Sequence, residues 1–155
     1  MWLMMSVSAL KKSILRHLNE TSSFIEKLDD KIILQEPISG SRPLGEIVLH
    51  MIRSIHFYLK GCIKDIWEPQ PFSLEKYSTA QEIKKLYETV VKTTETYLEK
   101  FSPDILQVVV EDFNRLATKE EILQEMIEHS IHHRGQLSVY FRLLKVDPPV
   151  IEYII

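Results

Sequence analysis

Apolar residues recur at steps of three and four along four long segments of this chain, and no other feature constrains the fold as strongly. An α-helix turns by about 100° per residue, so residues spaced in this way lie on one face of an amphipathic helix. The first segment runs from about Val7 to Leu28. Its stripe is Leu10, Ile14, Leu18, Thr21, Ile25 and Leu28.

The second segment begins near Pro43 and continues to about Ile63. Proline is favoured in the first turn of a helix, and Ser41 just before it is the expected cap. Apolar residues cover nearly all sides of this segment. We therefore expect it to be the most buried helix.

The third segment begins at Ser78 or Thr79, because Ser78 with Gln81 and Thr79 with Glu82 each fit a capping box. The residue before a proline disfavours helical geometry, so Ser102-Pro103 marks the end of this helix. Its expected stripe is Ile83, Leu86, Val90, Thr94, Tyr97 and Phe101.

The fourth segment opens with a capping box of Thr118 and Glu121 and runs to about Lys145, where an Asp-Pro-Pro run stops it. Before it, the β-branched run 108–110 favours an extended strand. After it, the apolar tail 150–155 is expected to fold back over the other helices. These segments predict an all-α four-helix bundle in a single domain, residues 1–155.

Composition restricts the function classes. The chain has 155 residues, 45% of them hydrophobic and 26% charged, as in ordinary globular proteins, and only 4 glycines, which argues against a β-sandwich or barrel. The net charge is −3 and no cluster of Lys and Arg stands out, so we expect no nucleic-acid partner.

The single cysteine, Cys62, excludes an internal disulfide and suits a reducing cytoplasm. The apolar start, residues 1–5, lacks the basic region and cleavage site of a signal peptide. It is also far shorter than the ~20 residues that a membrane span needs. We therefore expect a cytoplasmic protein with no membrane partner.

Three histidines carry the main functional prediction. His129 and His133 lie one helical turn apart, which is a common half-site for zinc, and we expect both to face the core. Buried neutral imidazoles must find partners for both nitrogens, and a metal ion removes that difficulty. His50 lies in the middle of an apolar face of the second segment and would supply a third ligand. The alternative is a plain structural bundle whose histidines hold no metal.

The other candidate ligands are less suitable. His132 lies about 100° round the helix from its neighbour and is expected at the rim of the site. His56 lies about 240° round the second segment from His50 and points elsewhere. His17 is interpreted as structural. Cys62 is roughly 18 Å along the helix from His50, which is too far for both to bind the same ion.

The zinc metalloprotease motif is absent, because its general base is a Glu directly after the first His and Ser130 stands there. Glu128 precedes the pair and projects off their face. No nucleophile–base pair or Gly-rich phosphate loop is visible either.

At these residues the chain resembles the DinB/YfiT-like family of candidate metalloenzymes. The resemblance spans essentially the whole chain. It rests on Leu44-Gly45-Glu46-Ile47-Val48-Leu49-His50, on His129-Ser130-Ile131-His132-His133-Arg134-Gly135-Gln136, and on Asp147-Pro148-Pro149.

The resemblance implies an up-down-down-up bundle, with His50, His129 and His133 binding a metal in the core, often in a homodimer. Ile127 and Ile131 point away from the histidines and could support such a dimer, or cover other helices of the same bundle. Histidine-only ligation suits zinc, nickel, iron or copper.

Two functions remain open from the sequence. The first is a metal-dependent enzyme, thiol S-transferase-like or hydrolase-like, which activates a low-molecular-weight thiol or a water towards a small electrophilic substrate. The alternative is a non-catalytic metal-dependent binding or stress-response module. Residues that could line a pocket, or merely pack in the core, are Ser54, Phe57, Tyr58 and Tyr140.

Overall fold

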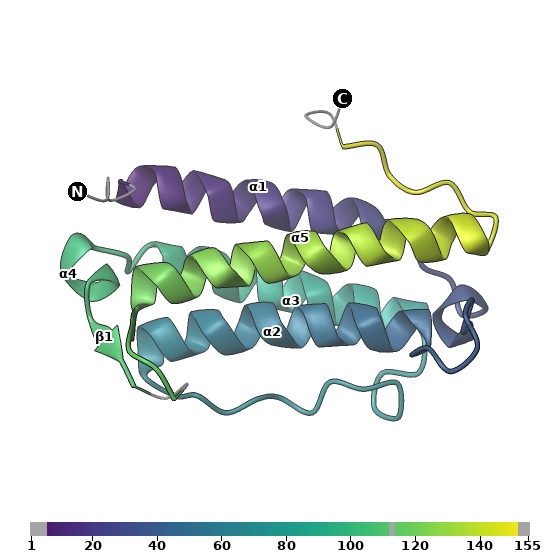
Figure 1. Ribbon diagram of the computed structural model, residues 1–155, viewed down its shortest axis with the longest axis horizontal. Coiled ribbons are helices and arrows are strands. Elements are labelled where there is room, and N and C mark those ends of the chain that lie inside the picture. The colour runs from purple at the N-terminus through teal and green to yellow at the C-terminus, as the bar shows by residue number, and fades with distance from the viewer. Residues whose placement is uncertain (1–5, 112–113, 152–155) are drawn as a thin grey trace.

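Four long helices lie side by side and enclose the core in a computed structural model that describes residues 6–111 and 114–151. Helices α1 and α5 run in one direction and α2 and α3 in the other (Figure 1), which confirms the predicted up-down-down-up bundle. The four helices are α1 (Val7–Glu26), α2 (Leu44–Lys64), α3 (Ala80–Leu98) and α5 (Lys119–Leu143). None of the described helices is long and apolar enough to cross a membrane.

Short elements connect the long helices. The strands pair antiparallel, with Val109 opposite Thr118, so the predicted extended run is confirmed and leads the chain directly into α5. These elements are η1 (Ile32–Leu34), α4 (Pro103–Leu106), β1 (Val109–Val110) and β2 (Ala117–Thr118).

Capping boxes begin two of the helices, as predicted. Thr79 accepts the backbone N–H of Glu82, and the Glu82 carboxylate accepts that of Thr79 in return. Thr118 and Glu121 make the same reciprocal pair at α5. Each box provides acceptors for two backbone N–H groups at the start of the helix, which have no acceptor within the helix itself.

The start of α2 differs from the prediction that Ser41 caps it. Pro43 is the N-cap residue, and its side chain makes no capping hydrogen bond. The backbone N–H of Leu44 donates instead to the Gln35 carbonyl, 3.0 Å away, so the preceding connection takes the role of the cap.

Three of the four long helices end slightly earlier than the sequence predicted, and α2 ends at Lys64, close to its predicted end. α1 stops at Glu26 and α3 stops at Leu98, and Ser102 then caps the separate helix α4. α5 stops at Leu143, and Lys145 just beyond it has a φ of 59°. A left-handed residue cannot continue a right-handed helix.

The connection between the parallel helices α2 and α3 returns along the bundle (Figure 1). It packs on α2 at two glycines. A Cβ atom on Gly61 would lie 2.2 Å from the Trp67 ring, and one on Gly45 would lie 2.8 Å from Leu74. The Glu46 carboxylate also accepts the Leu74 N–H at 2.7 Å. This covering explains why α2 is apolar on nearly every side, as its sequence indicated.

The buried face of α5 is turned further round than the sequence indicated. We expected His129 and His133 to face the core, but both are partly exposed, whereas Ser130 and Arg134 next to them are buried. The histidines therefore lie at the margin of the core between α2 and α5. The buried residues of α5 are Lys119, Glu120, Ile122, Leu123, Met126, Ile127, Ser130, Arg134, Leu137, Tyr140 and Phe141.

Two other surface expectations are met in part. Ile127 is buried and covers its own bundle, whereas Ile131 is 46% exposed. In the tail, Ile151 packs against the core, but Val150 is 90% exposed. The rest of the tail that was expected to fold back, residues 152–155, lies outside the described residues.

Candidate metal site

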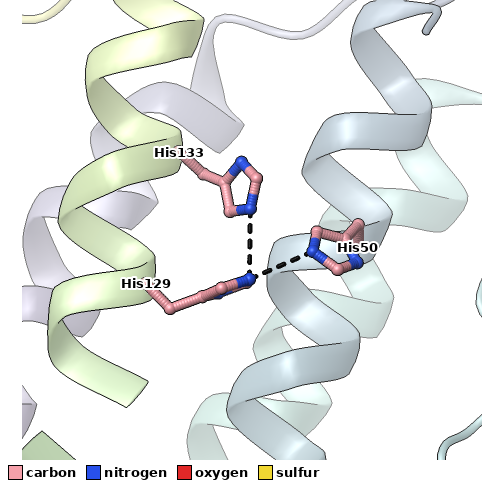
Figure 2. Close-up of side chains that lie close together, drawn as sticks. All are labelled: His50, His129 and His133. Carbon is pink, nitrogen blue, oxygen red and sulfur yellow. Dashed lines mark hydrogen bonds between the residues drawn. The ribbon is translucent and has the colours of Figure 1, made fainter. Parts of the chain in front are cut away.

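Three histidine rings meet between α2 and α5 (Figure 2). His50 Nε2 lies 3.0 Å from His129 Nε2, which lies 3.1 Å from His133 Nε2. One ring nitrogen from each residue falls within 4.8 Å of the other two. The convergence agrees with the sequence analysis, and metal binding itself stays a prediction.

The polar partners of two of these rings indicate where their protons lie. An Arg53 Nη2 group lies 2.9 Å from His50 Nδ1, and a guanidinium can only donate, so Nδ1 accepts and Nε2 carries the hydrogen. The Gln136 amide oxygen lies 2.9 Å from His133 Nδ1. That oxygen accepts, so His133 holds its hydrogen on Nδ1 and a lone pair on Nε2.

His129, between the other two, is left with poorly matched neighbours. Its Nε2 can accept one hydrogen bond, from His50, because an imidazole nitrogen has a single in-plane position. No proton then separates His129 Nε2 from the lone pair of His133 Nε2. Its Nδ1 is buried and has no hydrogen-bond partner among the described residues. The chain's own atoms thus leave this cluster incompletely satisfied.

A divalent ion fits this arrangement. Zinc–nitrogen bonds of about 2.0–2.1 Å in tetrahedral geometry put ligand nitrogens about 3.3 Å apart, close to the two distances above. A set of neutral imidazoles is a ligand set that zinc, nickel and iron accept. Three protein ligands would leave a position open for a small molecule, as in catalytic zinc sites.

Burial keeps the three imidazoles neutral, which is the state that binds metal. Desolvation lowers the pKa of His50 to about 4, assisted by His133, Arg53 and Arg42. Desolvation likewise lowers the pKa of His129 to about 4, with His133 and His50 as further causes. The pKa of His133 is also lowered by burial, against a smaller opposite effect of Gln136.

The remaining histidines and the cysteine lie as expected. His132 is exposed beside the His133 ring, and the His56 ring is 6.2 Å from Phe72, outside the cluster. Cys62 is buried away from the cluster, where desolvation raises the pKa of its thiol to about 12.

The four suggested pocket residues are in large part explained by packing. Tyr140 is buried in the core, and the Ser54 hydroxyl donates to the His50 carbonyl of its own helix at 2.9 Å. The Phe57 and Tyr58 rings contact each other with centroids 5.3 Å apart. Packing and helix-internal hydrogen bonding therefore account for Tyr140 and Ser54 without a role in a pocket.

Two residues of the site were missed in the sequence, Arg53 and Gln136. Each stands three residues after a histidine on the same helix, a spacing at which side chains meet. That spacing is the signal that could have identified them.

Comparison with known proteins identifies the family and the fold of the chain. The sequence profile of the DinB family matches residues 4–155. The protein YjoA of Bacillus subtilis is 30% identical over 131 residues, which are 83% of this chain and 84% of YjoA. The crystal structure of YjoA superposes with a TM-score of 0.75 at 25% identity and covers 91% of this chain and 95% of its own.

Two further crystal structures share the fold. A DinB-like protein from Bacillus cereus gives a TM-score of 0.78 at 22% identity, over 93% of this chain and 96% of that one. A mycothiol-dependent maleylpyruvate isomerase gives a TM-score of 0.60 at 14% identity, over 90% of this chain and 68% of that one.

Proposed function

The chain belongs to the DinB family, and from that premise we propose that it is a metal-binding protein whose His50, His129 and His133 hold one divalent ion. The observation that carries this proposal is the meeting of three Nε2 atoms, 3.0 and 3.1 Å apart, from two helices. The short approach of His129 Nε2 to His133 Nε2, which the tautomers assigned above leave without a hydrogen between them, supports it, since an ion would accept both lone pairs.

The activity that this site supports best is metal-dependent chemistry on a thiol or a water, as in a thiol S-transferase or a hydrolase. A bound divalent ion would supply a Lewis acid that lowers the pKa of a nucleophile near it. His129 and His133 offer lone pairs to one point, and Gln136 fixes the orientation of His133. The fold shared with a mycothiol-dependent isomerase supports a low-molecular-weight thiol as co-substrate and a small electrophile as its acceptor.

A second candidate is a metal-dependent binding or stress-response module without turnover. It is favoured by the composition of the cluster, which consists of histidines alone among the described residues. Turnover of a panel of electrophiles, with and without added thiols, distinguishes the two functions. Thiol-dependent consumption that is lost with His133→Ala supports the enzyme.

We further propose zinc, nickel or iron as the ion, a cytoplasmic location, a single domain over residues 1–155 and a homodimer as the assembly. Ile131, one of several exposed apolar residues on α5, supports the dimer.

Metal analysis of gently purified protein tests the site. We expect stoichiometric metal in the native protein and its loss with Ala at His50, His129 or His133. His56→Ala is the matched control, because it removes a partly buried imidazole of α2 outside the cluster and should keep the metal. Full metal content in His133→Ala would contradict the three-histidine site.

A further inference from the structure

Two histidines of the cluster have a polar neighbour three residues later, and the two neighbours have opposite hydrogen-bonding character. The Gln136 oxygen accepts from His133 Nδ1, 2.9 Å away. Arg53 Nη2 donates to His50 Nδ1, also 2.9 Å away. The two contacts have the same spacing along the helix and the same length. In one of them the histidine Nδ1 accepts the hydrogen, and in the other it donates the hydrogen.

This difference matters because a metal-binding histidine almost always donates its other N–H to an acceptor. The pair of His133 and Gln136 already has that form. The pair of His50 and Arg53 does not, since a guanidinium has five donors and no acceptor. With Arg53 on Nδ1, the His50 hydrogen occupies Nε2, which is the atom that faces the other two histidines.

We propose that Arg53 is a positioning residue that restrains His50 and thereby weakens metal binding at the three-histidine site. This inference rests on the proposed metal site. For His50 to join His129 and His133 on an ion, Arg53 leaves Nδ1 and the imidazole hydrogen moves from Nε2 to Nδ1. The step exchanges one tautomer for the other, so no net proton is taken up or released and the guanidinium stays charged.

The position of Arg53 suits such a role. It is half-buried on the same helix as His50 and makes the hydrogen bond across one turn, so a change of its side-chain torsions alone can release it. Its positive charge also repels a cation at the cluster. The effect of the hydrogen bond must therefore be separated from the effect of the charge.

Three variants make that separation. Arg53→Gln removes the charge and offers an oxygen that can accept from His50 Nδ1, as Gln136 does for His133. Arg53→Met removes the charge and offers no acceptor. Arg42→Gln removes a different charge that acts on His50 and His133.

Zinc affinity, measured by competition with a chromophoric chelator, gives the first readout. We expect both Arg53 variants to bind zinc more tightly than the native protein, and Arg53→Gln about ten-fold more tightly than Arg53→Met, the lower end of the usual effect of such a partner residue. Arg42→Gln should gain less than Arg53→Gln. Zinc affinities of Arg53→Gln and Arg53→Met no higher than that of the native protein would overturn the role of Arg53, whereas a native protein that binds no zinc would overturn the metal site itself.

The tautomer of His50 gives a second readout that needs no metal. In chelator-treated native protein, long-range proton–nitrogen NMR correlations should show the His50 hydrogen on Nε2 and the His133 hydrogen on Nδ1. In Arg53→Gln the His50 hydrogen should move to Nδ1. A His50 that carries its hydrogen on Nδ1 in the native protein would overturn the inference.

Discussion

Helix α5 carries two polar clusters on neighbouring sides, and they differ in how far the chain's own atoms satisfy them. Arg134 points towards α1, where it donates to His17 Nδ1 at 2.8 Å, to Glu20 at 3.0 Å and to Thr21 at 3.3 Å. Its side chain is 2% exposed, and the Glu20 carboxylate offsets its charge. The arginine cluster therefore serves to join α1 to α5.

The histidine cluster, one residue earlier on α5, has little of this completeness. Its rings are half-buried, no hydrogen lies between the Nε2 atoms of His129 and His133, and His129 Nδ1 lacks a partner among the described residues. Arg134 Nε also lacks a hydrogen-bond partner among the described residues, but both of its terminal nitrogens are paired with α1, whereas the histidine cluster brings ring nitrogens of three residues together. We infer that the arginine cluster stabilises the bundle, whereas the histidine cluster binds the proposed metal ion.

The largest expected effect is on the arginine side. Arg134→Met removes the hydrogen bonds to α1 and leaves the Glu20 carboxylate without this guanidinium, so we expect the free energy of unfolding to fall by about 3–5 kcal/mol. Urea denaturation of chelator-treated protein measures it. Arg142→Met, an exposed arginine of the same helix, is the control and should change stability by less than about 0.5 kcal/mol. A loss below about 1 kcal/mol in Arg134→Met would remove the contrast between the clusters.

The difference between the predicted and the observed buried face of α5 shows which features of the fold could be predicted from the sequence. Helix positions and two capping boxes follow from spacing, because apolar stripes and capping boxes are local signals. The meeting of His50 with the α5 pair was inferred from its apolar helix face and from the family resemblance. The buried face was missed because it contains Ser130 and Arg134, which no hydrophobic pattern counts as core. The burial of Arg134 depends on His17 and Glu20, more than a hundred residues away along the chain.

The hydrogen bonds of the site lie beyond the sequence for a similar reason. Gln136 and Arg53 both have the spacing of a helical neighbour, but sequence alone does not reveal which nitrogen of each ring they contact. That detail decides the tautomers, and it required the side-chain geometry.

The next effect concerns the histidine side. Zinc at about 100 times its dissociation constant should raise the free energy of unfolding of the native protein by about 2.7 kcal/mol, by binding to the folded state alone. His133→Ala should gain nothing, whereas His56→Ala should gain as much as the native protein. Thermal or urea unfolding with and without zinc gives the result. Equal zinc stabilisation of His133→Ala would place the ion elsewhere.

The stability of the protein should also depend on pH through the histidine cluster. The pKa of His50 and of His129 is lowered to about 4 in the folded state, against about 6.5 when unfolded. The unfolded chain therefore takes up protons first. The stability contributed by the neutral rings is complete above about pH 6.5 and is lost as pH falls towards about 4.

Zinc adds to this dependence, because protons compete with the ion for the imidazoles. We expect the thermal midpoint of zinc-loaded protein to fall more steeply below neutral pH than that of chelator-treated protein. Parallel melting curves over that range provide the test. If both forms lost stability equally, the three histidines would be structural residues that hold no metal.

The smallest effect is expected at the outer surface of α5. Ile131 is 46% exposed on a helix whose Ile127 is buried, so a charge at Ile131 should weaken a dimer without harming the core. Sedimentation of native protein and Ile131→Glu at micromolar concentration measures it, with unchanged zinc affinity as the check on folding. A monomeric native protein would count against the dimer.

The most direct test of the account is a crystal structure of zinc-loaded protein with anomalous diffraction at the zinc edge. We predict one peak between α2 and α5, about 2.0–2.1 Å from Nε2 of His50, His129 and His133, with Arg53 no longer on His50 Nδ1. A peak bound by other residues, or no peak at these histidines, would contradict the claim that this cluster is a metal site.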